Sequence, residues 1–209
     1  MKKPVGLFIT FEGVEGAGKS TLIREVALRL STQWKREVIM TREPGGSRVA
    51  EKIRSVILGE PMHPKTELFL YEAARAEHLA QTILPALDAE KIVLCDRYAD
   101  SSLAYQAHAR GLNWEDVKKL NTLATGGLKP DLTVMLDVDP ALGLARASDQ
   151  NRFEKEGVEF QKKVRAGFLK ARAEEPRRWL VIKVKAETPE QLADLVCKRI
   201  SLRFKKKLK

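Results

Sequence analysis

The chain has few of the residues that mark secreted, metal-binding or membrane proteins. Only 2 of its 209 residues are cysteine and 3 are histidine, and their spacing fits no zinc site. Cys95 and Cys197 both lie in apolar segments, so we expect buried thiols rather than a disulfide. No apolar run is long enough to span a bilayer, and the first residues lack the apolar stretch of a signal peptide. We therefore expect a soluble, cytoplasmic protein.

Internal repeats and low-complexity linkers are also missing. Hydrophobic residues make up 44% of the chain and charged residues 32%, which suits one folded domain over residues 1–209. The net charge of +10 is partly concentrated in the last residues, 204–209, which we expect to form a solvated basic tail. Other arginines lie inside loop motifs, where a polyanionic small molecule would explain them.

Short apolar segments with strand character alternate with helical patterns along the chain. The predicted strands are residues 5–11, 38–41, 92–95, 132–137 and 180–184. This alternation predicts an α/β fold of three layers, with a five-stranded parallel sheet flanked by helices. Right-handed crossovers bring the carboxyl ends of the strands to one edge, where ligands bind in open α/β sheets.

Three sequence signals set the expected helix ends. Residues 64–90 form a long amphipathic segment, which Pro85 kinks or ends. Asn113 can cap a helix that stops at Gly126. Residues 188–191 read as a capping box with proline at the first helical position, so the last helix starts there.

Residues 13–20 match the pattern G-x-x-x-x-G-K-[ST] at every fixed position, between a predicted strand and a predicted helix. Such a loop turns its backbone N–H groups toward an anion, and the helix dipole adds to the attraction. Lys19 can reach the β- and γ-phosphates, and Ser20 can offer its hydroxyl to Mg²⁺. The residues expected to bind a nucleoside triphosphate are Gly13, Val14, Glu15, Gly16, Ala17, Gly18, Lys19, Ser20 and Thr21.

Two further polar motifs follow predicted strands and indicate a second phosphate site. Residues 41–47 contain Arg42, and residues 96–98 contain Arg97 beside Asp96. Each guanidinium is a planar donor suited to a phosphate, and Asp96 could hold Mg²⁺ through water. Because both arginines come close to a triphosphate loop, we expect an acceptor that already carries a phosphate.

These motifs together resemble the thymidylate kinase family, over nearly the whole chain. The resemblance rests on Phe-Glu-Gly-Val-Glu-Gly-Ala-Gly-Lys-Ser at 11–20, Thr-Arg-Glu-Pro-Gly-Gly-Ser at 41–47, and Asp-Arg-Tyr at 96–98 followed by Ser101, Tyr105 and Gln106. It implies a P-loop kinase that transfers the γ-phosphoryl group of ATP to dTMP, giving dTDP and ADP in dTTP biosynthesis. It also implies a homodimer formed through helices near the Asp-Arg-Tyr segment.

The resemblance assigns roles to residues of the acceptor site. Arg42 and Arg97 would grip the dTMP phosphate, and Glu15 would contact the sugar 3′-hydroxyl and help to orient Arg42. The base and sugar pocket would be formed by six side chains: Pro44, Tyr71, Arg75, Ser101, Tyr105 and Gln106.

Within that pocket the resemblance gives each side chain a contact. Tyr71 would stack on thymine while Arg75, one helical turn later, bonds to the base. Pro44 would lie near the thymine methyl group, Ser101 and Gln106 would complete the base pocket, and Tyr105 would lie under the deoxyribose. Packing alone could explain either tyrosine, and a surface ion pair could explain Arg75. Glu51 and Arg54 read as a surface pair or as support for the preceding loop.

A short lid is expected at about residues 146–155. Some members of the family carry an arginine in the phosphate loop at the position of Gly16, and others keep glycine there and supply basic residues from a lid. This sequence follows the second pattern, so Arg146 and Arg152 are candidate ligands of the transferring phosphoryl group. Asn151 stands where the family pattern has aspartate, and both arginines could also be ordinary surface charges.

Two alternatives remain at the level of sequence. The first is a kinase for another nucleotide or nucleoside. The second is a P-loop NTPase that binds nucleic acid and uses hydrolysis as a switch, which the positive charge favours weakly. The chain has no repeated stacking-and-basic pattern, so we expect neither nucleic acid nor a membrane as partner.

Overall fold

The computed structural model describes residues 5–34, 36–147, 153 and 155–208, with side chains as far as residue 205. Its sheet consists of β1 (Leu7–Glu12), β2 (Val38–Arg42), β3 (Ile92–Asp96), β4 (Leu132–Asp137) and β5 (Trp179–Lys183). All four pairings are parallel, and the strand order is β2-β3-β1-β4-β5. The predicted five-stranded α/β fold is confirmed, with strand ends within two residues of the prediction.

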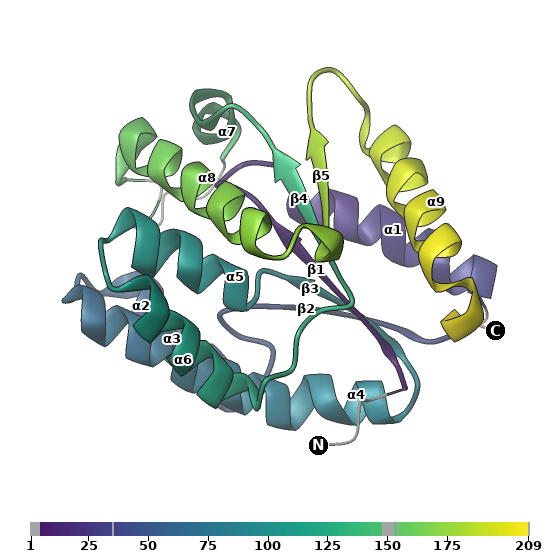
Figure 1. Cartoon of the computed structure of the whole chain (residues 1–209), viewed down its shortest axis with the longest axis horizontal. Helices are drawn as coiled ribbons and strands as arrows, with labels where there is room; N and C mark the ends of the chain where they lie inside the picture. The colour runs from purple at the N-terminus through teal and green to yellow at the C-terminus, as the bar shows by residue number, and fades with distance from the viewer. Residues whose placement is uncertain (1–4, 35, 148–152, 154, 209) are drawn as a thin grey trace.

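Helices cover both faces of the sheet, as Figure 1 shows. On one face lie α1 (Lys19–Trp34) and α9 (Pro189–Leu208). The other face carries α2 (Arg48–Gly59), α3 (Pro64–His78), α5 (Ala99–Ser102), α6 (Trp114–Thr125) and α8 (Gly157–Glu174). The shorter segments are η1 (Leu79–Ile83), α4 (Leu84–Asp88), η2 (Leu103–Ala109), α7 (Pro140–Arg146) and η3 (Pro176–Arg178).

The central strands are buried along their whole length because helices lie above and below them. Every residue of β1 and of β4 is buried, as expected for the interior strands of a parallel sheet. Leu7, Ile9 and Phe11 belong to the larger apolar cluster, whereas Phe8 packs edge-on against Tyr98 in a second cluster. The alternation follows the two-residue period of a strand.

The predicted helix ends are confirmed by their hydrogen bonds. Asn113 accepts the N–H of Asp116, and Gly126 takes the left-handed conformation after α6. The side chains and backbones of Thr188 and Gln191 bond reciprocally before α9. The segment 64–90 is divided by the π-helical turn η1, because Pro85 has no N–H to continue the α-helical ladder.

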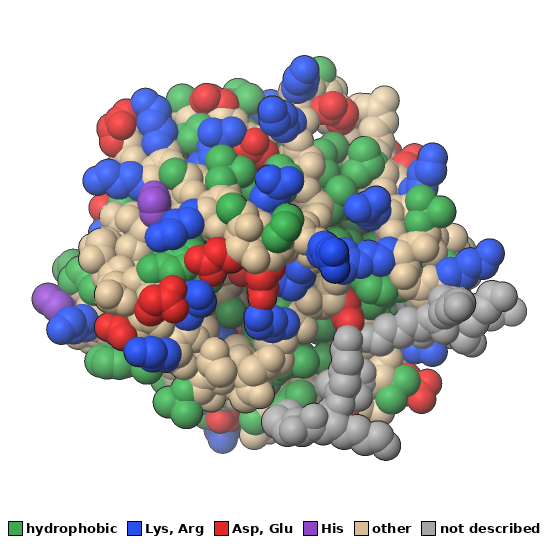
Figure 2. Space-filling model, viewed as in Figure 1, with side chains coloured by type: hydrophobic (Ala, Val, Ile, Leu, Met, Phe, Trp, Pro, Cys, Tyr) green, Lys and Arg blue, Asp and Glu red, His purple; other side chains and the backbone are tan. Residues whose placement is uncertain are grey.

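The end of the chain differs from the prediction. Residues 204–208 continue α9 rather than forming a tail, with a break in helical geometry at Phe204. The Phe204 ring packs against the core, which gives the helix a reason to continue. Lys and Arg side chains are spread over the face in Figure 2 with Asp and Glu between them, so the positive charge does not form one stripe there.

Two further expectations can be compared with the described residues. Cys95 and Cys197 are both buried and free, as predicted. None of the helices in the described part of the chain is both long and apolar enough to cross a membrane.

Candidate active site

The polar motifs meet at the carboxyl edge of the sheet, as the topology required. The phosphate loop connects β1 to α1, residues 43–47 follow β2, residues 97–98 follow β3, and α7 follows β4 closely. A cavity of about 340 Å³ lies along this edge. Its lining includes the phosphate loop from Glu15 to Thr21 together with Arg42, Glu43, Arg54, Asp96, Arg97, Arg146 and Ala147.

The glycines of the phosphate loop differ in their surroundings. Gly16 and Gly18 both have positive φ, 65° and 87°. A Cβ at Gly16 would lie 1.9 Å from the carbonyl oxygen of Gly143 in α7, whereas a Cβ at Gly18 would meet nothing within 4 Å. Gly143 in turn packs against the backbone of Glu15. The close contact of α7 with the loop explains why this chain keeps glycine at position 16.

Lys19 lies inside the loop. Its side chain is buried, and Nζ donates to the carbonyl oxygens of Gly13 at 3.2 Å and Val14 at 3.0 Å. Burial, together with repulsion from Arg97, lowers the pKa of the Lys19 amine. Two carbonyl groups thus hold the ammonium at the centre of the predicted triphosphate site.

Glu15 and Arg97 form an ion pair at the centre of the site. Arg97 Nη2 donates to Glu15 Oε1 at 2.8 Å and Nη1 donates to the carbonyl oxygen of Gly13 at 3.0 Å. The hydroxyl of Tyr105 also donates to Glu15 Oε1, at 2.9 Å. Burial opposes ionisation of Glu15, yet Arg97 and Lys19 hold the pKa of its carboxyl below the ordinary value. The carboxylate is therefore charged and fixed in direction.

A second, smaller cavity of about 80 Å³ lies next to the first. It is lined by Glu15, Glu43, Pro44, Arg54, Leu58, Tyr71, Arg97, Tyr98, Ser101, Tyr105, Gln106 and Phe153. Glu15, Glu43, Arg54 and Arg97 line both cavities. The structure thus brings the sequence-predicted residues Pro44, Tyr71, Ser101, Tyr105 and Gln106 together around a cavity that Glu15 and Arg97 also line.

The donors beside the loop fit a magnesium ion. Ser20 Oγ donates to Asp96 Oδ2 at 3.0 Å, while the buried Asp96 Oδ1 has no hydrogen-bond partner among the described residues. An orphaned carboxylate oxygen next to a hydroxyl is suited to a hard cation that keeps several waters and takes its other oxygens from phosphates. No group of three or more His, Cys, Asp or Glu side chains that could hold a metal occurs among the described residues.

The comparison with known proteins now decides between the alternatives. A family model described as thymidylate kinase matches residues 11–195. The chain belongs to the thymidylate kinase family. It is accordingly an ATP-dependent nucleoside monophosphate kinase, a class that excludes the alternative of a P-loop switch.

Individual thymidylate kinases are similar along most of the chain. The thymidylate kinase of Lactobacillus delbrueckii subsp. bulgaricus is 46% identical over 90% of this chain and 92% of the relative. That of Geotalea uraniireducens is 48% identical over 85% of this chain and 89% of the relative. A crystal structure of the thymidylate kinase from Ehrlichia chaffeensis superposes with a TM-score of 0.78 at 32% identity, covering 94% of this chain and 98% of that chain.

Arg42, one of the two arginines predicted to grip the acceptor phosphate, lies at the rim of the larger cavity. Its side chain is 53% exposed, and Nη2 donates to both carboxylate oxygens of Glu51, at 3.1 and 3.0 Å. Glu51 also accepts the N–H of Gly46. Glu51 therefore orients Arg42, and the expectation that Glu15 does so is wrong, because the thymidylate kinase loop turns Glu15 toward Arg97.

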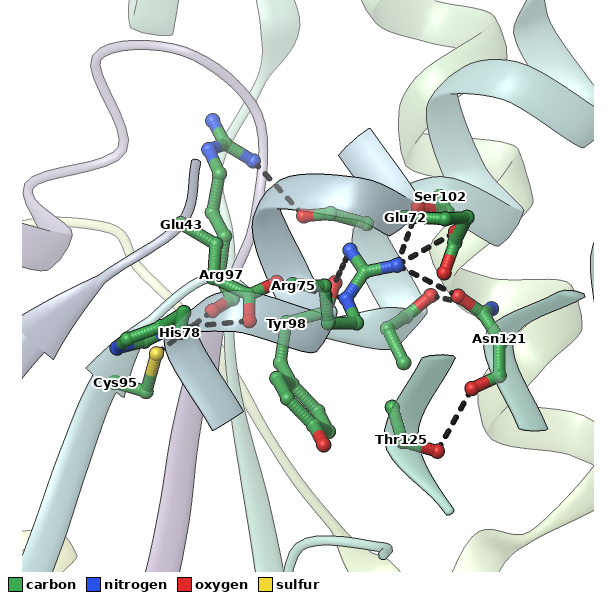
Figure 3. Close-up of polar contacts among 12 residues, drawn as sticks. Glu43, Glu72, Arg75, His78, Cys95, Arg97, Tyr98, Ser102, Asn121 and Thr125 are labelled. Atoms are coloured by element: carbon green, nitrogen blue, oxygen red, sulfur yellow. Dashed lines mark hydrogen bonds and ion pairs between the residues drawn. The ribbon is translucent and has the colours of Figure 1, made fainter. Parts of the chain in front are cut away.

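Arg75 lies behind the smaller cavity and is absent from its lining. Figure 3 shows its guanidinium among side chains from several elements, while Arg97 extends away from this cluster. The exposed fraction is only 1%, because Nε donates to Glu43 Oε2 at 2.8 Å and Nη2 to the carbonyl oxygen of Tyr98 at 3.2 Å. Nη1 has three acceptors: Glu72, Ser102 and Asn121.

These contacts do not place Arg75 in contact with a base. They show that it holds Glu43 and Tyr98, two residues that do line the pocket. Four of its five N–H groups are committed to these acceptors, so the predicted bond to the base stays a prediction that depends on the remaining Nη2 hydrogen.

Sequence reasoning did not single out several residues that line the cavities, among them Glu43, Arg54, Tyr98 and Phe153. Arg54 supports the preceding loop, as predicted, by donating to the carbonyl oxygen of Pro44 at 2.7 Å, but it also lines both cavities. Burial and repulsion from Arg42 hold the pKa of Arg54 below its ordinary value, so an anion there would relieve the repulsion. The spacing along the chain could have indicated this position. Arg54 lies two helical turns after the cap Ser47, on the side of α2 that faces the loop at residues 43–47.

Phe153 is another lining residue that the sequence did not single out. It is buried against the rings of Tyr71 and Tyr105, with centroid separations of 6.3 and 5.9 Å. In the sequence it is one apolar residue within the predicted polar lid. Among the residues predicted for the lid, Arg146 lies at the rim of the larger cavity. Asn151 and Arg152 lie outside the described residues.

Proposed function

We propose that the chain transfers the γ-phosphoryl group of ATP to dTMP, giving ADP and dTDP, as a step in the supply of dTTP. The observation that carries this proposal is that the two cavities share Glu15, Glu43, Arg54 and Arg97. A triphosphate on the loop and a monophosphate in the smaller cavity would meet at these residues. Such an arrangement supports in-line transfer, because phosphoryl transfer needs positioning and charge neutralisation more than a strong base.

On the donor side, the loop amides, Lys19 and Arg146 would neutralise the triphosphate of ATP. Lys19 would exchange its two carbonyl acceptors for phosphate oxygens, a gain because the present acceptors are uncharged. Mg²⁺ would be held by Ser20 and, through water, by Asp96, and when bound it would offset the charge that develops on the phosphate oxygens. From its place in the sequence, we infer that Arg152, like Arg146, neutralises charge on the triphosphate of ATP.

On the acceptor side, Arg97 would bind the monophosphate, with Arg42 and Arg54 at its other side. Arg97 is prepared for this role because Gly13 and Glu15 already fix its guanidinium. Glu15 would accept the 3′-hydroxyl of the sugar while it holds Arg97. Charge-assisted bonds of this kind give both affinity and direction.

The base would be held by the aromatic side chains and one amide. Tyr71 is suited to stack on thymine, Pro44 to contact its methyl group, and Tyr105 to exclude a 2′-hydroxyl. Gln106 donates its amide N–H to Glu67 at 2.7 Å, which leaves its carbonyl oxygen to accept the N3–H of a pyrimidine. Ser101 would complete the polar contacts.

A substrate panel tests this proposal. The protein is incubated with ATP and Mg²⁺ and, in separate reactions, with dTMP, dUMP, dCMP, AMP or thymidine, and the nucleoside diphosphates are measured. We expect dTDP as the main product and little activity when Mg²⁺ is chelated. A clear preference for dUMP, or for an unphosphorylated nucleoside, would contradict the assignment.

Quaternary structure and location stay predictions. A homodimer formed by helices near the Asp-Arg-Tyr segment is supported by two exposed apolar side chains on the adjacent helices α3 and α6. These are Phe69, 57% exposed, and Leu123, 80% exposed. Light scattering after gel filtration should give twice the monomer mass, and Phe69→Glu should lower it. A cytoplasmic location is inferred from the reaction alone.

A further inference from the structure

Glu12 is a buried carboxyl beside the active site that the mechanism above does not use. It is the last residue of β1, directly before the phosphate loop, and is 0% exposed. Oε1 accepts the backbone N–H of Tyr98 at 2.9 Å, and Oε2 lies 2.6 Å from Ser101 Oγ. Both partners belong to the short segment that follows Arg97. Burying a carboxyl without hydrogen bonds costs free energy, so these two contacts explain how the fold accommodates Glu12. They also show that Glu12 acts on the segment that follows Arg97.

Arg97 has a backbone conformation that needs support. Its φ is +69°, in the left-handed region that residues with a Cβ rarely adopt. The Arg97 N–H still bonds to the carbonyl oxygen of Phe11 at 2.9 Å. After that bond the chain leaves the sheet, and the next N–H, that of Tyr98, is received by Glu12. The side chain of Glu12 therefore replaces the strand-to-strand bond that the turn loses.

The direction of the Arg97 side chain depends on this turn. Its guanidinium bonds to Gly13 and Glu15, which both belong to the phosphate loop, and it lines both cavities. Ser101, which lines the smaller cavity, lies in α5, the first helical turn after Arg97. Glu12 thus connects the strand that carries the phosphate loop to the turn that carries two acceptor-site residues.

We propose that Glu12 is a positioning residue for the acceptor: it fixes the turn at residues 97–101, so that Arg97 points between the cavities and Ser101 toward the base pocket. The proposal rests on the proposed function, in which Arg97 contacts the acceptor phosphate. It concerns binding of the monophosphate rather than of ATP, since neither partner of Glu12 belongs to the phosphate loop.

The surroundings of the Glu12 carboxyl favour its protonated form. Burial and the neighbouring Asp100 raise the pKa of Glu12 to about 8, against the opposite effect of Arg97. Ser101 Oγ donates to Oε2 in the structure, and a proton on Oε2 allows the same 2.6 Å contact with donor and acceptor exchanged. Lys19 on α1 and Cys95 on β3 are further titratable groups near Glu12.

Three substitutions of Glu12 separate the effect of the proton from that of side-chain length. Glu12→Gln keeps an acceptor for Tyr98 and a donor for Ser101 at the same length, so it imitates the protonated carboxyl. Glu12→Asp keeps the carboxyl but is one methylene shorter, and Glu12→Ala removes both contacts. Thr10→Val is the matched control, because Thr10 is a buried polar residue on the same face of β1 whose hydroxyl bonds to Thr133 at 3.0 Å and reaches residues 97–101 only through the bond from Thr133 to Asp100.

The test measures KM for dTMP and for ATP, kcat, and the melting temperature of each variant. We expect Glu12→Ala and Glu12→Asp to raise the KM for dTMP by roughly tenfold or more with the KM for ATP changed less than about twofold, since small displacements of a binding group have effects of this size. Glu12→Gln should stay within about threefold of the wild type. Thr10→Val should lower the melting temperature and leave both KM values unchanged.

Three results would overturn the proposal. They are an unchanged KM for dTMP in both Glu12→Ala and Glu12→Asp, an equal rise in both KM values, or a loss in Glu12→Gln as large as in Glu12→Asp. If Glu12→Ala does not fold, the comparison of Asp with Gln decides. Activity of the wild type on dTMP tests the proposed function separately. If the wild type prefers another monophosphate, the same comparison is made with that acceptor.

Discussion

The contact between Gly16 and α7 leads to a prediction that separates steric from conformational effects. In Gly16→Ala, the new Cβ would lie 1.9 Å from the carbonyl oxygen of Gly143 and 2.7 Å from its carbon, so α7 must move. The positive φ of 65° adds strain of about 1–2 kcal/mol, and forcing extra volume into a packed site costs about 1–3 kcal/mol more. For a chain of this size we expect the melting temperature to fall by roughly 5–15 °C.

Gly18→Ala is the matched control. It has a positive φ of 87° but no atom within 4 Å of the new Cβ, so only the conformational strain applies, and we expect a fall of roughly 2–6 °C. Thermal unfolding followed by circular dichroism, with urea titration as a second measurement, gives the difference between the two variants. Equal destabilisation would refute the steric reasoning. Gly16→Arg should be at least as unstable as Gly16→Ala, so an arginine at this position is incompatible with the present placement of α7.

Three further predictions follow from the site. Lys19→Ala should abolish turnover without lowering the melting temperature, because the buried ammonium's hydrogen bonds to described residues go to two uncharged carbonyl groups; retained activity would contradict its role. Arg97→Ala should raise the KM for dTMP by about ten- to a hundredfold, as expected for loss of a charge-assisted bond, and the KM for ATP far less; equal rises would place Arg97 elsewhere. The pKa of Glu12 is raised from 4.5 to about 8, so the folded chain keeps a proton that the unfolded chain releases. The free energy of unfolding should therefore fall as the pH rises from about 5 to about 8, by up to about 1.4 kcal/mol per pH unit. The fall should be smaller in Glu12→Gln, and an equal dependence on pH in the two proteins, measured by urea titration at each pH, would contradict this.

Local signals in the sequence predicted most of the fold. Apolar segments gave the five strands because interior parallel strands are buried on both faces. The caps at Asn113 and Thr188 were predictable because a cap bonds only to residues two or three positions away. The basic end of the chain was misjudged, since four lysines suggest a solvated tail while Phe204 provides the apolar contact that extends the helix.

The candidate site was predictable where its residues share a short motif. The phosphate loop with Lys19 and Ser20 could be located because its pattern fits the turn from strand to helix. The partners of the charged side chains could not be predicted. Glu15 turns to Arg97 and not to Arg42, and nothing along the chain distinguishes the two arginines, since one ends a strand and the other directly follows a strand of the same sheet.

The sequence alone determined that this protein is built on a parallel sheet with a triphosphate loop and two arginine-bearing turns, because these features depend on the order of neighbouring residues. Only the tertiary structure decided that Arg75 is enclosed among five acceptors, that Arg54 lines both cavities, and that Glu12 supports the Arg97 turn. These contacts join residues from different elements. A hydrogen bond or an ion pair depends on distances of about 3 Å, and such distances are set by the packing of helices and strands rather than by spacing along the chain.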